Sequence, residues 1–199
     1  MRIVSFLGSF LLAASAAAPG LASSLPAKGA LRFDVIRKGK DIGDHSYTFS
    51  GSPSSYSVNV QTDIAVKLPL LRINAYVFKQ KSSERWNGQS MTTIRSATDD
   101  NGTAHQLDQP GTGILPASLW NDAIVKSHTL LNTIDGRIMS VKVTDLGDQA
   151  VPTRRGTVMA HHYRISGDLD RDVWYDSDGN LAHVSFKADD GSTVTYLRK

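Results

Sequence analysis

The sequence predicts a mainly β protein built from short antiparallel strands, and three observations carry this prediction. Apolar and polar residues alternate along most of the chain, which is the spacing of strands with one buried face. Turn-forming residues, rich in Asp and Gly, separate these runs at intervals of roughly 8–12 residues. The chain also has 18 Asp but a single Glu. Aspartate favours turns and caps whereas glutamate favours helices, so little helix is expected.

The alternating runs define the expected strands in chain order. They lie around residues 31–35, 56–68 and 71–78, and later around residues 141–143, 163–165, 184–186 and 194–196. Hairpin turns that tolerate positive φ are expected at 38–40, 99–102, 177–180 and 189–192. No alternation of strands with helices is present, so an antiparallel sheet, a barrel or a sandwich is expected rather than a parallel sheet.

One segment departs from this pattern. Residues 105–116 are polar and rich in Gly and Pro, and Pro116 is well placed to start a helix. Leu119, Trp120, Ala123 and Ile124 then recur at helical spacing, which predicts one short amphipathic helix over 116–126. Two roles stay open for it. As a lid over a cavity, it would present Leu119, Trp120 and Ile124 to an apolar ligand; as a packing element, it would bury the same three side chains in the core.

The N-terminus has the features of an export signal. Arg2 precedes an apolar run over residues 3–18, and Gly20-Leu21-Ala22 places small residues where signal peptidase reads them. We therefore expect a signal peptide over 1–22 and a single β-rich domain over 23–199, located in the periplasm. A retained membrane anchor is the alternative. The run is shorter than the roughly 20 residues that span a bilayer, so we expect no integral membrane protein after cleavage.

Composition and motifs exclude several functions. The absence of Cys excludes disulfides, thiolate metal sites and a Cys nucleophile. The net charge of +3, without a Lys/Arg block, argues against nucleic-acid binding. The sequence lacks the serine-hydrolase elbow, the P-loop, the dinucleotide-binding glycine motif and the zinc-protease helix motif. We therefore expect neither an enzyme nor a cofactor.

Candidate metal ligands are also weak. His161 and His162 are adjacent on an expected strand, so their side chains point to opposite faces and cannot chelate one ion together. The Asp-rich stretch 168–178 resembles a calcium loop, but Val173 occupies the sixth position, where such a loop needs Gly. No metal site is predicted. Glu84, beside Arg85, is interpreted as a surface ion pair or a strand-end charge.

Several longer strings resemble a family of exported bacterial proteins, the domain of unknown function 6134. These are LPASLWN (115–121), LLNTIDG (130–136), HYRISGDLDRDVWYDSDGNL (162–181) and SFKADDGSTVTYL (185–197). The first half, with LRFDVIRKGKDIGDHSYTF (31–49), also resembles its larger relative, the domain of unknown function 3108. The resemblance implies a strongly curved antiparallel sheet or half-barrel with one short helix on its concave side. It supplies no catalytic residue, and its Trp174 and Tyr175 are expected on opposite strand faces.

Two functions follow from these expectations. The first is a periplasmic, non-enzymatic binding protein that holds an apolar or lipid-like ligand in a curved β-sheet. The alternative is a structural or interaction protein of the envelope that binds another protein through a sheet edge. An enzyme with an unrecognised site is the third and least supported class.

Overall fold

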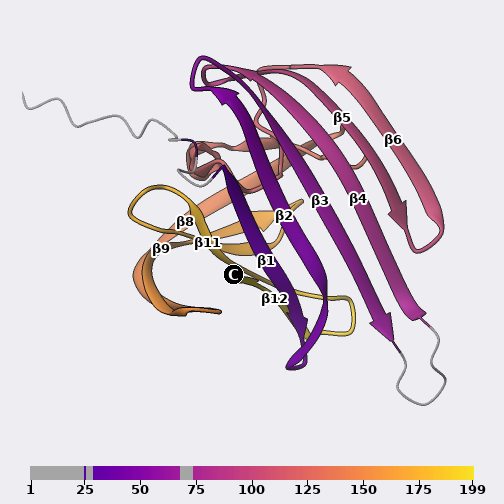
Figure 1. Cartoon of the computed structure of the whole chain (residues 1–199), viewed down its shortest axis with the longest axis vertical. Helices are drawn as coiled ribbons and strands as arrows, with labels where there is room; N and C mark the ends of the chain where they lie inside the picture. The colour runs from indigo at the N-terminus through magenta and orange to yellow at the C-terminus, as the bar shows by residue number, and fades with distance from the viewer. Residues whose placement is uncertain (1–24, 26–28, 68–73) are drawn as a thin grey trace, which may run out of the picture.

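The computed structural model describes residues 25, 29–67 and 74–199. These residues form one open 12-stranded sheet in which all hydrogen-bonded neighbours are antiparallel (Figure 1). The strand order is β6-β5-β4-β3-β2-β1-β12-β11-β10-β9-β8-β7. The expectation of a mainly β, antiparallel protein is confirmed. The expected signal segment 1–22 and residues 71–73 of one expected strand lie outside the described residues.

Each half of the chain forms a meander of hairpins. The first comprises β1 (Ala30–Arg37), β2 (Lys40–Ser52), β3 (Ser55–Lys67), β4 (Asn74–Asn87), β5 (Ser90–Asp100) and β6 (Thr103–Pro110). The second comprises β7 (Thr129–Leu131), β8 (Ile138–Thr153), β9 (Gly156–Gly167), β10 (Arg171–Tyr175), β11 (Leu181–Lys187) and β12 (Thr193–Arg198). Pairing of β1 with β12, in which Val35 faces Tyr196, joins the halves into one sheet.

Two of the expected turns show why their residues are needed. Lys38 and Gly39 link β1 to β2 with φ of +51° and +73°, and Asn101 and Gly102 link β5 to β6 with φ of +51° and +93°. Positive φ at both central residues matches the right-handed twist of the flanking strands, and Asn and Gly adopt it at little cost. The sequence signal for these hairpins is confirmed.

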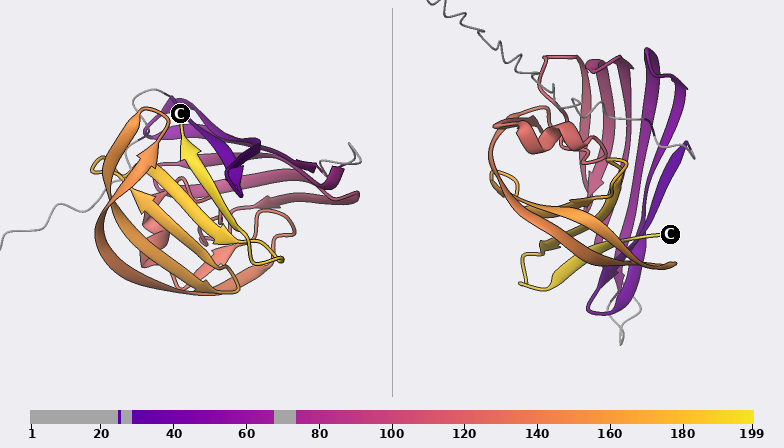
Figure 2. Two further views of the ribbon diagram at one scale, coloured as in Figure 1. Left: turned by 90° about the horizontal axis from the view of Figure 1, so that it is seen from below. Right: turned by 90° about the vertical axis from the view of Figure 1, so that its left-hand side faces the viewer.

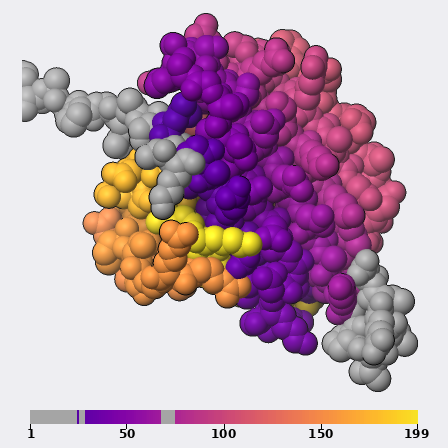
Figure 3. Space-filling model, viewed as in Figure 1, coloured from indigo at the N-terminus to yellow at the C-terminus, as the bar shows by residue number. Residues whose placement is uncertain are grey.

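The sheet curls strongly, so that β7–β12 bend round to face the inner side of β1–β6 (Figure 2). The long β8–β9 hairpin packs across the outer face of β10 and β11, where its Val151 and Ala160 join Trp174 and Ala182 in one cluster. At its tip the Arg154 amide donates to the Arg198 carbonyl at 2.8 Å, and the Arg154 guanidinium pairs with Asp34. The C-terminal segment, yellow in Figure 3, also ties the halves together. The Lys199 amide donates to the Arg32 carbonyl of β1 at 2.9 Å, and the Lys199 ammonium bridges Asp34 and Asp44 at 2.6 Å each.

Strand alternation separates an inner core from a small outer cluster. The inner core gathers large side chains from both halves, including Phe33, Trp86 and Tyr175. Trp174 instead packs outward against Val151 and Ala182, beneath the β8–β9 hairpin. The prediction that Trp174 and Tyr175 occupy opposite strand faces is therefore confirmed.

The expected α-helix over 116–126 is not confirmed. Only Asp122–Lys126 is helical, as a short 3-10 helix (η1) capped by the Asn121 side chain. We call residues 111–128, which connect β6 to β7, the strap. Its Leu119 has a φ of +68°, which interrupts a right-handed helix, and the preceding Pro116 bridges to Leu131 of β7. Tertiary contacts thus override the helical spacing of the apolar residues.

Candidate functional site: a cavity at the open end of the sheet

A row of polar side chains divides the inner face of the sheet into two ends. His45, Thr62, Gln80 and Thr98 are direct cross-strand neighbours on β2, β3, β4 and β5, and all four are buried. His45 Nδ1 lies 2.8 Å from Thr62 Oγ1, and the Gln80 amide donates to Thr98 Oγ1 at 3.1 Å. We call these four residues the polar row. The strap packs into the core on one side of the row, and a cavity lies on the other.

Glu84 holds the strap in the core. Its carboxylate is 0 % exposed, and one oxygen, Oε2, accepts the indole N–H of Trp86 and of Trp120, both at 3.0 Å. Burial raises the pKa of Glu84, and the hydrogen bonds from Trp120 and Trp86 oppose that rise. The interpretation of Glu84 as a surface charge is therefore wrong. Its position two residues before Trp86 on β4, in the same strand phase, is the sequence signal that would have placed it inside.

The sheet also binds the strap backbone. The Tyr175 hydroxyl donates to the Leu119 carbonyl at 2.8 Å, and the Tyr47 hydroxyl donates to the Ser118 carbonyl. The Trp120 ring stands edge-on to Trp86, with ring centres 5.3 Å apart. These contacts use carbonyls that a helix would otherwise use internally, so they also account for the missing helix.

The three residues predicted to bind a ligand all lie in this packed region. Leu119, Trp120 and Ile124 are 7 %, 4 % and 0 % exposed and belong to the main inner core. This is the core-filling arrangement, one of the two roles that the sequence left open. The apolar cavity lies instead at the other end of the sheet, beyond the polar row.

A cavity of about 660 Å³ lies at that other end, which we call the open end. Its apolar lining comes from five strands (β2, β3, β4, β11 and β12), the β11–β12 turn and the turn before β8. It comprises Ile42, Ile64, Val66, Phe78, Ile134, Phe186, Ala188, Val194 and Tyr196. Two of these, Ile64 and Val194, form a small core cluster with Val35. The remaining lining residues are polar or charged: Arg37, Tyr76, Asp100, Arg171, Lys187, Asp189 and Asp190.

Some of the charges at the cavity rim are paired within the chain. Asp190, in the β11–β12 turn, contacts Arg37 at 2.8 Å and Lys38 at 3.0 Å, which clasps that turn to the β1–β2 turn. These contacts and hydrogen bonds from Ser192 hold the pKa of Asp190 well below its usual range. Asp100 accepts a hydrogen bond from the Tyr76 hydroxyl at 2.9 Å. The rim is thus a set of ion pairs and hydrogen bonds around an apolar interior.

The histidines and aspartates that the sequence singled out have structural partners. His161 contacts Asp145 at 2.6 Å and Asp148 at 2.7 Å, whereas His162 contacts Asp172 at 3.0 Å, so the pair does not share a site. In the Asp-rich stretch, Asp172 pairs with Arg164 and Asp176 with Arg198, both at 2.7 Å. In the part of the chain that the structure describes, no three His, Asp or Glu side chains group as a metal site would require.

The edges of the sheet bear on the alternative function. The eight-residue edge strand β6 ends at Pro110, and its Asp108 pairs with Arg95 at 3.1 Å. Proline and charge are features that protect an edge from pairing with another chain. Within the described ranges, no helix is long and apolar enough to cross a membrane.

Fold and site together define a class: an open, barrel-like β-sheet protein with one end packed by a strap and a cavity at the other. Comparison with protein families then gives a specific assignment. The chain belongs to the family described as domain of unknown function (DUF6134), whose model matches residues 33–199. The resemblance seen in the sequence strings is confirmed.

Comparison with solved structures supports the fold. The chain is similar to the crystal structure of a beta-barrel-like protein of domain of unknown function DUF1849 from Brucella abortus, with a TM-score of 0.56 and 13 % identity. The match covers 85 % of this chain and 94 % of the Brucella chain. At this identity the likeness concerns the fold alone. None of the curated proteins compared matches the chain.

Proposed function

We propose that this chain is a non-enzymatic binding protein that holds an apolar, lipid-like molecule in the cavity at the open end of the sheet. The apolar lining of this cavity of about 660 Å³ carries the proposal, because ligand pockets are mostly apolar and typically measure roughly 300–1,000 Å³. Its lining combines branched aliphatic and aromatic side chains from strands far apart in the sequence. An acyl chain inserted there would shield that apolar surface from water.

The size of the hydrophobic effect sets the expected affinity. Burial of apolar surface contributes about 25 cal/mol per Å², and a micromolar dissociation constant corresponds to about 8 kcal/mol. Contact over roughly 330 Å² would therefore be needed, before the entropic cost of binding is subtracted. One acyl chain in this cavity is consistent with affinity in the micromolar range, without a charged contact.

A cavity-filling substitution tests this proposal. Ile134 lies in the turn before β8 rather than in a strand, and Ile134→Trp would place an indole in the cavity with little demand on the sheet. We expect the wild-type protein to bind a fluorescent fatty alcohol saturably at one site, and Ile134→Trp to weaken binding at least about tenfold. Fluorescence titration measures both.

Ile138→Trp is the matched control, because Ile138 is 58 % exposed on β8 and does not line the cavity. It should bind the fatty alcohol as the wild type does. Absence of saturable binding by the wild type would overturn the proposal. Equal affinity of Ile134→Trp and the wild type would place the ligand outside this cavity.

We further propose that residues 1–22 are removed and that the protein works in the periplasm. The support is the signal pattern around Arg2 and Gly20-Leu21-Ala22, together with the position of β1, which begins only at Ala30. Intact-mass measurement on a periplasmic extract should give a chain that begins at Ser23. Ala22→Arg should block this processing, and a wild-type chain that keeps Met1 in the membrane fraction would contradict the proposal.

A further inference from the structure

Arg171 is a partly buried cation in the cavity lining that has no anionic partner among the described residues. On β10 it shares the strand phase of Val173 and Tyr175, which belong to the inner core. Its guanidinium carbon lies 3.8 Å from the centre of the Phe186 ring. Among the described residues, its one hydrogen bond is to the backbone carbonyl of Asp170, at 2.7 Å, and no carboxylate lies within ion-pair distance.

The other described arginines differ from Arg171 in one of two ways. Six of them form ion pairs with aspartates: Arg37, Arg95, Arg137, Arg154, Arg164 and Arg198. The others, Arg32, Arg85 and Arg155, have no ion pair but are exposed to solvent. Arg171 alone among them is partly buried without a carboxylate. A cation removed from water is costly unless an anion compensates it.

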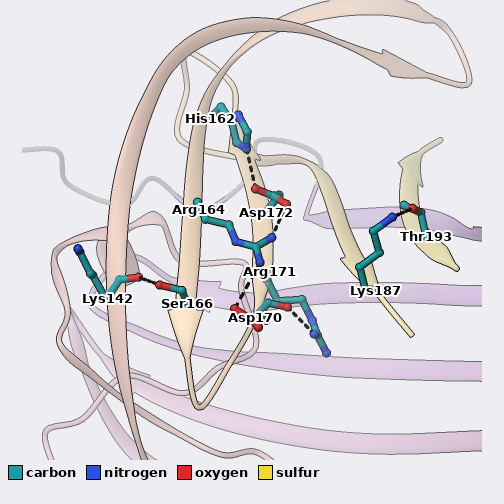
Figure 4. A network of polar contacts seen from close by, with 9 residues as sticks. All are labelled: Lys142, His162, Arg164, Ser166, Asp170, Arg171, Asp172, Lys187 and Thr193. Atoms are coloured by element: carbon teal, nitrogen blue, oxygen red, sulfur yellow. Dashed lines mark hydrogen bonds and ion pairs between the residues drawn. The ribbon is translucent and has the colours of Figure 1, made fainter. Parts of the chain in front are cut away.

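The carboxylates next to Arg171 in the chain are already engaged. Asp172, on the other face of β10, contacts Arg164 at 2.7 Å, and Asp170, just before β10, contacts it at 3.3 Å. Figure 4 shows the Arg171 side chain extending away from this Arg164–Asp172 pair. Burial lowers the pKa of Arg171, although a guanidinium stays charged at any physiological pH. At the rim, Asp190 is held by Arg37 and Lys38.

We infer that the ligand of the cavity is an anionic amphiphile whose head group pairs with Arg171 while its chain lies against the apolar lining. This inference rests on the proposed lipid-binding function and adds the charge of the ligand. The planar guanidinium presents donors that match a carboxylate or a phosphate, and its remaining N–H groups are free to donate to either. A fatty acid and a monoacyl lysophosphatidate both supply this chemistry.

The experiment compares three competitors that share one acyl chain. Palmitate, palmitoyl lysophosphatidate and the neutral methyl palmitate each displace the fluorescent fatty alcohol from the wild-type protein. We expect at least one anion to bind about tenfold or more tightly than the ester, because a hydrogen-bonded charge pair contributes at that level. The stronger of the two anions identifies the head group.

Variants then assign the preference to Arg171. Arg171→Met should remove the preference for the anion while changing ester affinity no more than about twofold, and Arg171→Lys should retain part of it. Arg95→Met is the matched control, because Arg95 is 69 % exposed outside the cavity. It should leave every affinity unchanged.

The outcomes separate the two proposals. If the ester and both anions bind the wild type equally, the cavity binds lipid, but the inference of an anionic head group is wrong. An anion preference that persists in Arg171→Met likewise overturns the role of Arg171. If no competitor and no probe binds, the proposed function itself fails. The wild-type comparison decides the head-group question even if a variant does not fold.

Discussion

Replacing Trp120 with alanine is expected to lower the free energy of unfolding by about 3–5 kcal/mol. The indole is 4 % exposed, its ring contacts Phe49 and Trp86 edge-on at 5.3 Å, and its N–H donates to the buried Glu84. Truncation would open a void in the inner core and remove a donor from a buried acid. Urea denaturation followed by circular dichroism would measure the change.

Two further variants separate packing from hydrogen bonding. Trp120→Phe keeps a ring but removes the N–H donor to Glu84, so we expect a smaller loss of about 1–3 kcal/mol. Ile138→Ala, at a 58 % exposed position, should change stability by less than about 0.5 kcal/mol. If Trp120→Ala instead weakened fatty-alcohol binding more than it lowered stability, Trp120 would act as a lid over the ligand and the core-filling assignment would be wrong.

Acidification from pH 6.5 to 4.5 is expected to lower the free energy of unfolding by up to about 5 kcal/mol, through two buried histidines. Burial lowers the pKa of His45 from 6.5 to about 3 and that of His183 from 6.5 to about 4. Between these values and 6.5, the unfolded chain binds protons that the folded chain does not. Stability is therefore present above pH 6.5 and is lost as the pH falls, by about 1.4 kcal/mol per histidine per pH unit.

Other groups modify this pH dependence. The pKa of Glu84 is raised by burial, so the folded state holds that proton more readily than the unfolded state does, and its contribution increases on acidification. The pKa of His161 is raised, most strongly by its hydrogen bond to Asp145, so its contribution to stability also increases on acidification. This contribution is small, because the pair lies near the surface, where solvent screens it. Both effects offset part of the loss from His45 and His183.

Urea denaturation at pH 7.5, 6.5, 5.5 and 4.5 would test the prediction. His45→Gln should remove about half of the acid-induced loss, whatever its effect on stability at neutral pH. His128→Gln is the control, since His128 is exposed in the loop before β7, and it should follow the wild-type curve. A flat wild-type stability between pH 6.5 and 4.5 would contradict the burial of neutral imidazoles.

Local patterns in the sequence were sufficient for much of the sheet. Period-two alternation placed Val58 and Val60 of β3, and Val184 of β11, on buried faces, as the structure confirms. Turn residues placed the β1–β2 and β5–β6 hairpins. Adjacent strand positions were enough to send Trp174 and Tyr175 to different clusters. Each of these inferences depends only on backbone geometry, which nearest neighbours in the chain determine.

The strap and the cavity could not be predicted from local patterns in the sequence. Helical spacing over 116–126 was a correct sign of burial, since Leu119, Trp120 and Ile124 are all in the core, but it was misleading about backbone conformation. Glu84 was misassigned because a lone charge beside Arg85 usually lies at the surface. Arg171 was not singled out, although it shares its strand phase with Val173 and Tyr175. For both residues, the strand phase indicates an inward-facing side chain. Their charge favours a surface position instead, so the phase alone was not decisive.

By itself, the sequence determined the strand content, the hairpin turns, the phase of each strand and membership in the DUF6134 family. Only the tertiary structure decided that β1 pairs with β12, that the sheet stays open, and that Glu84 and Arg171 lie inside it. The physical reason is how far apart in the chain the interacting residues lie. Alternation and turns follow from the conformations of neighbouring residues, whereas burial of a charge depends on partners such as Trp120 and Phe186, which long-range strand pairing brings within contact.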